Sequence, residues 1–303
     1  MTRAAALALM VAAPVLWSSA GVVTRHIERA EAIEQVFWRS FFAFLFVTII
    51  LSLRGGPWKA LRNAGLPGLF SGVLWAVMFT AFVIALSLTT TANTLVMMSI
   101  APLLTVVCAR IVLTDPIPLR TWIAALAAMA GIAIMFSSSM ESHAAGMLVA
   151  LVIPVASALN VVALRKHSTT LDLIPAVMLG GALSALVALP LALPISASGK
   201  DLALLAFLGV LQLGLPCMFL VMASRALLAP EIALLGLLEV VLGPLWAWLG
   251  AGETPATSTL IGGVLVLIAL AGNEIAAFRV RKGRIIIEAN PLHAPALGAT
   301  RKG

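Results

Sequence analysis

Three ionisable residues lie inside long apolar stretches of the sequence, and the first of them is Glu239. It is near the middle of its stretch and has no Lys or Arg within four residues. In a membrane, an ionisable side chain of this kind typically faces a cavity or a partner. Glu239 is therefore a candidate proton acceptor or substrate contact. A hydrogen bond across a helix interface is the structural alternative.

Arg39 and Glu274 are the other two ionisable residues. Arg39 lies one turn inside the end of its stretch, so its side chain could reach the membrane surface beside Glu34 or Glu31. It could instead contact a substrate carboxylate or Glu239. Glu274 lies close to Arg279, which favours an ion pair at the membrane interface.

Uncharged polar side chains supply further candidates. Asn160 and Gln212 are each isolated among apolar neighbours and are predicted to line a cavity, with cross-helix hydrogen bonding as the competing interpretation. Aromatic and Met side chains could form an adaptable apolar wall, although many at such positions only pack or face lipid. The predicted substrate-binding or coupling residues are Glu239, Arg39, Asn160, Gln212, Trp17, Trp75, Phe79, Met98 and Ser99.

No pattern in the sequence indicates a cofactor, a metal site or a catalytic centre. The phosphate-loop pattern GxxxxGK and the catalytic patterns HExxH and GxSxG are all missing. Cys108 and Cys217 lie in apolar stretches, where small buried side chains are expected rather than a disulfide. The four histidines are predicted in loops or in the tail: His26, His143, His167 and His293.

The elements that must position these residues follow from the composition. Of 303 residues, 62% are apolar and 10% charged, and the mean hydropathy is +1.11. A soluble chain is about half apolar and about a quarter charged. The sequence therefore predicts a membrane protein, with the lipid bilayer as a partner. The net charge of +7 lies in loops and indicates topology rather than nucleic-acid binding.

Ten apolar stretches are long enough to be considered as transmembrane helices of about 20 residues each. The first is predicted to be an uncleaved span rather than a signal peptide. The predicted spans are 4–23, 33–53, 66–86, 92–113, 121–137, 146–164, 171–193, 202–224, 232–249 and 260–278.

The distribution of basic residues predicts the orientation. If the N-terminus is cytoplasmic, 15 of the 19 Lys and Arg residues fall on the inner side, and only Arg25, Arg29 and Lys200 fall outside. Cytoplasmic loops of membrane proteins carry such an excess. Both termini are therefore predicted to be cytoplasmic, which requires an even number of spans.

An internal repeat relates the two halves of the sequence at an offset of about 138 residues. Pro14 and Pro154 are each followed eleven residues later by an arginine, and Gly72-Val73-Leu74 matches Gly209-Val210-Leu211. The segment 101–115 likewise corresponds to 239–253. Five spans per copy would make the copies antiparallel. Inverted repeats are a device of secondary transporters, in which similar halves exchange conformations around a central site.

With these motifs the chain resembles the drug/metabolite transporter superfamily, specifically its EamA-type ten-helix members. The resemblance covers nearly the whole chain except the tail. The chain departs from the family pattern at Asp115, where Glu is usual, and at Val240, which replaces a proline that would explain a bend. The matching segments are Leu16-Trp17-Ser18-Ser19, Arg39 with 41–45, 99–104 leading to 113–115, and Leu238-Glu239 leading to Gly252-Glu253.

The expected molecule is an all-α membrane protein of ten transmembrane helices in two inverted five-helix repeats. Its parts are a first repeat (1–137), a short outer linker (138–145), a second repeat (146–278) and a basic cytoplasmic tail (279–303). The resemblance implies export of small metabolites, such as amino acids or drugs, across a bacterial inner membrane. Proton coupling is a hypothesis that rests on Glu239. An uncoupled facilitator or a channel-like protein is the alternative, and the sequence leaves substrate and oligomeric state open.

Overall fold

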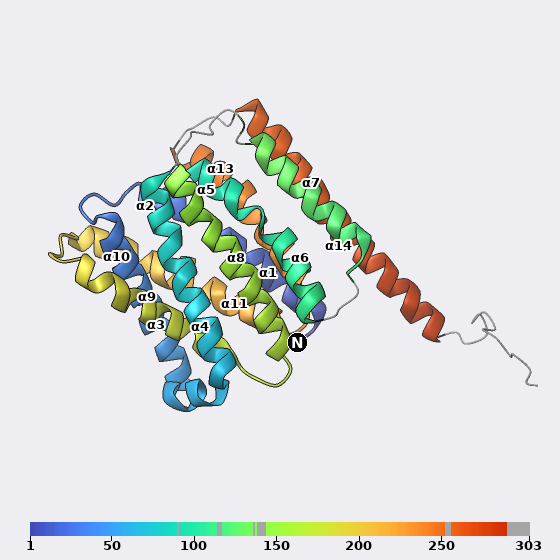
Figure 1. Ribbon diagram of the computed structural model, residues 1–303, viewed down its shortest axis with the longest axis horizontal. Helices are drawn as coiled ribbons and strands as arrows, with labels where there is room; N and C mark the ends of the chain where they lie inside the picture. Colours follow the sequence, from blue (N-terminus) through green and yellow to red (C-terminus); the bar gives the residue numbers. More distant parts are fainter. Residues whose placement is uncertain (90, 114–116, 136, 138–143, 252–255, 290–303) are drawn as a thin grey trace, which may run out of the picture.

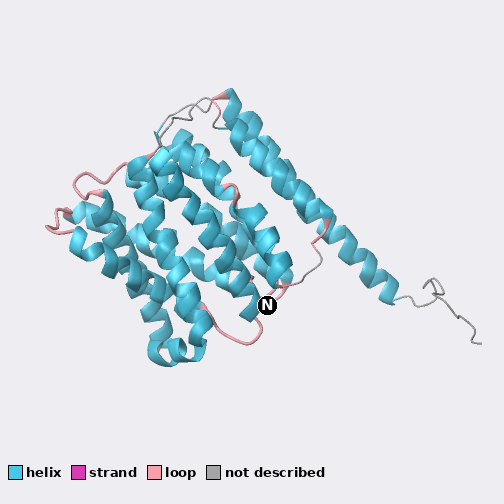
Figure 2. Ribbon diagram, viewed as in Figure 1, coloured by secondary structure: helices cyan, strands magenta, loops and turns pink. Residues whose placement is uncertain are grey.

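The computed structural model describes the whole chain except residues 90, 114–116, 136, 138–143, 252–255 and 290–303. Every regular element in the described part is helical (Figure 2). This is the expected solution in hydrocarbon, because a helix satisfies its backbone N–H and C=O groups within one segment. The all-α prediction is confirmed.

The helices of the first half pack between and against those of the second half in one bundle (Figure 1). Residues 1–137 contain α1 (Arg3–Trp17), α2 (Ala20–Thr24), α3 (Ala32–Leu53), α4 (Pro57–Leu88), α5 (Thr91–Met98), α6 (Ala101–Val112) and α7 (Leu119–Met135).

The second half begins with α8 and ends with the longest helix, α14. The elements are α8 (Ala144–His167), α9 (Ile174–Ala188) with the 3₁₀ turn η1 (Leu189–Leu191), α10 (Gly199–Phe207), the π-helical segment η2 (Leu208–Gly214), α11 (Leu215–Ala223), α12 (Ala229–Gly236), α13 (Leu238–Ala251) and α14 (Thr257–Ala289).

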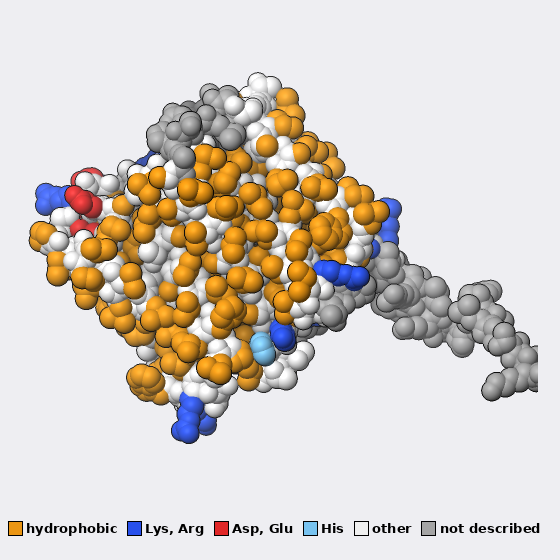
Figure 3. Space-filling model, in the orientation of Figure 1, with side chains coloured by type: hydrophobic (Ala, Val, Ile, Leu, Met, Phe, Trp, Pro, Cys, Tyr) orange, Lys and Arg blue, Asp and Glu red, His pale blue; other side chains and the backbone are white. Residues whose placement is uncertain are grey.

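Nine helical segments of the described chain are long and apolar enough to cross a membrane, and α7 is a shorter apolar helix of 17 residues. The ten predicted spans thus correspond to nine long segments and one short one. Large apolar side chains cover the outside of the bundle between its ends (Figure 3). Such a surface is stable only in lipid. The protein is a multi-pass membrane protein.

The ends of two predicted spans need comment. The third span was expected from Leu66, and α4 begins at Pro57, but Gly65, with φ of +56°, divides α4 into two helical pieces, the second of which begins where the span was expected. Glycine adopts this left-handed conformation at little cost. The seventh span was expected over 171–193, whereas α9 ends at Ala188 and the chain continues through Pro190 as a 3₁₀ turn.

Several predicted spans are interrupted rather than continuous. The first is broken at Ser18 and Ser19, and the fourth at Ser99, and each serine hydroxyl donates to a backbone carbonyl three residues earlier. Such bonds compete with the helical ladder. The ninth is broken at Leu237, between α12 and α13. The break therefore exists although Val240 replaces the proline of the family pattern.

Glycines allow the close approach of several helices. A Cβ at Gly181 would lie 2.9 Å from the backbone oxygen of Ser40, so α9 and α3 are in backbone contact there. Gly131 of α7 and Gly262 of α14 face each other in the same way. These two helices run side by side along one flank of the bundle (Figure 1).

An ion-pair cluster joins the beginning of the chain to its last helix. One guanidinium nitrogen of Arg3 lies 2.9 Å from Glu231 and 2.9 Å from Glu274. Glu274 therefore forms an ion pair, as predicted, but its partner here is Arg3 and not the neighbouring Arg279 that suggested the pair. The contact also places residues 3 and 274 at the same end of the bundle.

Candidate functional site

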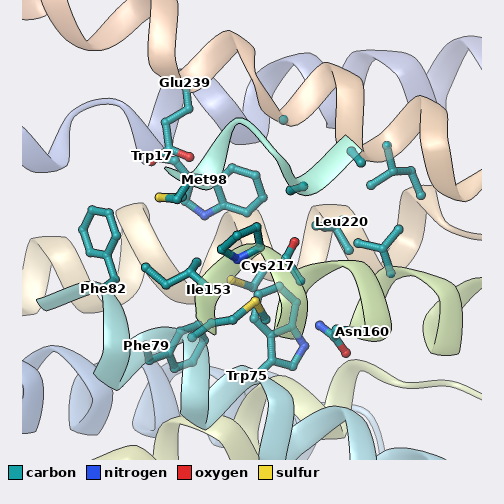
Figure 4. Close-up of a pocket in the computed structure, with 18 of the residues that line it drawn as sticks. Trp17, Trp75, Phe79, Phe82, Met98, Ile153, Asn160, Cys217, Leu220 and Glu239 are labelled. Atoms are coloured by element: carbon teal, nitrogen blue, oxygen red, sulfur yellow. The ribbon is translucent and has the colours of Figure 1, made fainter. Parts of the chain in front are cut away.

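A cavity of about 150 Å³ lies inside the bundle, between helices of both halves (Figure 4). It adjoins two of the helix breaks, since Met98 and Ala101 flank one break and Gly236 and Leu237 the other. Discontinuous helices at such depth are tolerated where they line a cavity, because their free backbone groups find partners there.

Eight of the nine predicted site residues line this cavity. The exception is Ser99, which is 1% exposed and donates its hydroxyl to the carbonyl of Val96 at 2.6 Å. It stabilises the helix break instead of facing the cavity. The eight that line it are Glu239, Arg39, Asn160, Gln212, Trp17, Trp75, Phe79 and Met98.

Arg39 is buried on α3 and does not reach the membrane surface, so the interpretation as an interfacial side chain is wrong. It is 4% exposed, donates to the carbonyl of Phe79 at 3.3 Å and lies 5.7 Å from the ring centre of Phe82. Glu34, its suggested partner, accepts from Ser196 instead. No ion pair joins Arg39 to a carboxylate of the described residues.

Glu239 lies in the first turn of α13, directly after the break at Leu237. The free N–H groups of a first helical turn favour a negative charge. Its side chain is partly exposed and extends toward Trp17 and Met98 (Figure 4). No hydrogen bond holds its carboxylate to another described residue. The carboxylate is therefore available to a proton or a ligand.

Four buried polar atoms of the cavity wall have no hydrogen-bond partner among the residues that the structure describes. Three are donors: Arg39 Nε, Trp75 Nε1 and Asn160 Nδ2; the fourth is the acceptor Gln212 Oε1. The other ends of these side chains are held, since Asn160 Oδ1 accepts from Ser71 at 2.6 Å and Gln212 Nε2 donates to the carbonyl of Trp17 at 3.3 Å. A buried polar group without a partner is costly, so such groups indicate a ligand or water site.

One face of α4 supplies most of the aromatic wall. Trp75, Met78, Phe79 and Phe82 recur at intervals of three and four residues, which places them on one side of the helix. The rings of Trp75 and Phe79 lie 5.5 Å apart. Apolar and aromatic walls with a few polar groups are typical of sites for small organic molecules.

Comparison with known proteins identifies the first half of the chain. The model of the EamA-like transporter family matches residues 4–137. Residues 4–137 are EamA-like. For these residues, the resemblance to EamA-type transporters is confirmed.

Similar proteins cover the EamA-like half and the second half together. The pseudopaline exporter CntI of two strains of Pseudomonas aeruginosa is 27% identical over 257 residues, which span 83% of this chain and 88% of the exporter. The family and relative names point to a membrane transporter rather than to an enzyme.

A solved crystal structure shares the fold of this chain. It superposes with a TM-score of 0.78 at 20% sequence identity, and the match covers 92% of this chain and 99% of that one. At this identity the likeness concerns the fold alone.

The cavity is also lined by residues that the sequence analysis missed. Ser157 precedes Asn160 by three positions, so the helical period could have placed both on one face of α8. Cys217 is buried as expected, but it also lines the cavity. No sequence signal separates it from Cys108, because both lie in apolar stretches.

Proposed function

We propose that the chain is a secondary transporter that exports small metabolites across a bacterial inner membrane by alternating access. The observation that carries the proposal is the cavity between helices of both halves, with unpaired buried polar atoms in its wall. The name of the relative, a pseudopaline exporter, supports export. The resemblance of the sequence to EamA-type transporters suggests amino acids or related compounds, or drugs, as the substrate range.

The inverted repeat is part of this proposal, and the pattern of helix packing supports it. In the first half α4 packs against α8 and α9, and in the second half the corresponding segment α10–η2–α11 packs against α1 and α3. When the two halves are exchanged, α3 corresponds to α9 and α7 to α14. The contacts of α3 with α9 and of α7 with α14 are therefore each equivalent to themselves. The proposed halves are 1–137 and 146–278, joined by 138–145, and the family match also ends at residue 137.

Positions about 138 residues apart also line the same cavity. Trp17 corresponds to Ser157, Trp75 to Gln212 and Ala101 to Glu239, at offsets between 137 and 140. The two helix breaks beside the cavity, at Ser99 and Leu237, differ by 138 positions. Two similar halves around one site are what alternating access requires.

Both termini are proposed to lie in the cytoplasm, with the basic tail 279–303 on that side. The excess of Lys and Arg in the corresponding loops supports this orientation. The ion pair between Arg3 and Glu274 supports a common side for the two ends of the bundle.

Coupling to protons is proposed to occur at Glu239. A carboxylate in a membrane interior binds a proton readily when it has no cationic partner, because its charged form is poorly solvated. Purified protein in liposomes with an imposed pH gradient tests this, with metabolite flux followed by mass spectrometry. We expect Glu239→Gln to abolish the dependence of flux on the gradient.

The matched control is Glu28→Gln, which removes the charge of an exposed carboxylate. This variant should keep both the rate and the gradient dependence of the wild type. Gradient-dependent flux through Glu239→Gln at the wild-type rate would remove Glu239 as the coupling site. Flux that ignores the gradient in the wild type would favour the alternative, an uncoupled facilitator or channel-like protein.

A further inference from the structure

The corner of the cavity between α4 and α8 contains two donors that point to one ligand group. Asn160 is 1% exposed and Trp75 is 5% exposed, and neither Asn160 Nδ2 nor Trp75 Nε1 has a hydrogen-bond partner in the described part of the chain. Ser71 and Trp75 lie one turn apart on the same face of α4, and Ser71 binds Asn160. The two side chains are therefore neighbours, as Figure 4 also shows.

Ser71 sets the orientation of the Asn160 amide. Its hydroxyl donates to Asn160 Oδ1 at 2.6 Å, and Ser71 itself is 0% exposed and does not line the cavity. With the amide oxygen occupied, the amide nitrogen is the end left for the cavity. An indole N–H can only donate, and an amide NH₂ group can only donate. These two N–H donors therefore favour a ligand group that accepts hydrogen bonds and disfavour one that can only donate them.

We propose that Asn160 and Trp75 form an acceptor subsite that binds a carboxylate or carbonyl oxygen of the transported molecule, with Ser71 as its positioning residue. The inference rests on the proposed transport function and names the chemistry of the cargo at this corner. The remainder of the cargo lies along Phe79 and Phe82 toward Arg39, which contacts the same face of α4 one turn beyond Trp75. A cavity of about 150 Å³ has room for a ring-sized apolar group.

The size of the cavity and its aromatic wall suggest a matched set of phenyl probes. Phenylacetate presents a carboxylate, phenylacetamide presents a neutral carbonyl, and 2-phenylethylamine presents an ammonium group that can only donate. Calorimetric titration of the purified full chain in detergent measures the affinity of each. The wild type is expected to bind one or both of the acceptor probes more tightly than the amine.

The decisive variant is Asn160→Asp, which keeps the size of the side chain and its bond from Ser71 but replaces the amide N–H₂ by an oxygen. We expect at least about a tenfold loss of affinity for phenylacetate, equivalent to about 1.4 kcal/mol. Affinity for 2-phenylethylamine should rise in the same variant. This inversion of preference would not follow from a purely structural role of Asn160.

Ser71→Ala tests the positioning role, and Ser71→Thr, which keeps the hydroxyl, should restore the wild-type preference. Ser71→Ala should weaken acceptor probes severalfold without affecting the amine. The matched control is Ser184→Ala, because Ser184 is also a buried serine that bonds to neighbouring helices, through Ser40 and Thr80, away from the cavity.

Two results would overturn the subsite. One is that Asn160→Asp leaves the order of the three affinities unchanged, and the other is that the wild type binds none of the acceptor probes. Binding of phenylacetate alone or of phenylacetamide alone identifies the carboxylate or the carbonyl as the preferred group. Metabolite flux in wild-type liposomes is independent of these titrations, so loss of the subsite and loss of the transport function are separable results.

Discussion

Polar side chains of the cavity differ in whether the protein provides hydrogen-bond partners for all their polar atoms, and Arg39 is the clearest case. Its guanidinium bonds to the carbonyl of Phe79 and lies over Phe82, while Nε stays free at the cavity. This arrangement needs the planar, forked guanidinium and not only a positive charge.

We therefore expect Arg39→Lys to lower the initial rate of metabolite flux in liposomes by at least about tenfold. The ammonium group of lysine does not reproduce a planar group that contacts both Phe79 and Phe82. Arg225→Lys is the control, because Arg225 pairs with Asp172 on the exposed surface. An unchanged rate in Arg39→Lys would show that only the charge matters at this position.

Small residues, rather than charges, set the close contact between α7 and α14. A Cβ at Gly262 would lie 2.6 Å from Cγ of Met135 and would also meet the backbone oxygen of Gly131. α14 and α7 would then have to move apart. At Gly272, on the same helix α14, an added Cβ would meet nothing within 4 Å.

We expect Gly262→Ala to lower the free energy of unfolding by roughly 1–3 kcal/mol, the usual effect of an added group in a tightly packed contact. Gly272→Ala should leave it unchanged or raise it by up to about 1 kcal/mol, because alanine favours a helix. Thermal unfolding of both variants in one detergent compares them. Equal stability of the two would contradict close packing of α7 against α14.

The whole molecule is expected to open its cavity to one side of the membrane at a time. The chain has two cysteines, so Cys108→Ala leaves Cys217, which lines the cavity and is 1% exposed, as the only thiol. A membrane-impermeant maleimide should label Cys217 slowly, and from only one face in a given state. Imposing a pH gradient should change the ratio of labelling from the two faces.

Labelling is measured by mass spectrometry on vesicles of known orientation, with the unfolded protein as the reference for full reactivity. The variant without either cysteine controls for reaction at other groups. Simultaneous rapid labelling from both faces would contradict alternating access and favour a channel-like protein. This measurement also reports the side to which the cavity opens without knowledge of the substrate.

The sequence by itself determined the membrane class, the all-α fold and most candidate residues of the cavity. Composition decides the class because only a bilayer accepts so much apolar surface, and hydrophobic length decides the helices. Glu239, Asn160 and Gln212 could be recognised because a polar group in an apolar span is costly unless it faces a cavity or a partner. Their local isolation is visible in the sequence.

Only the tertiary structure decided which polar atoms are satisfied and which are left for a ligand. Arg39 and Ser99 show the difference. Arg39 had plausible carboxylate partners in sequence but turned inward, and Ser99 was predicted to contact the substrate but bonds to the backbone carbonyl of Val96. Glu239 is likewise isolated in sequence, and the structure adds that its carboxylate faces a cavity shared by both halves. A hydrogen bond depends on atoms brought together from distant helices, so local sequence specifies the group and packing specifies its partner.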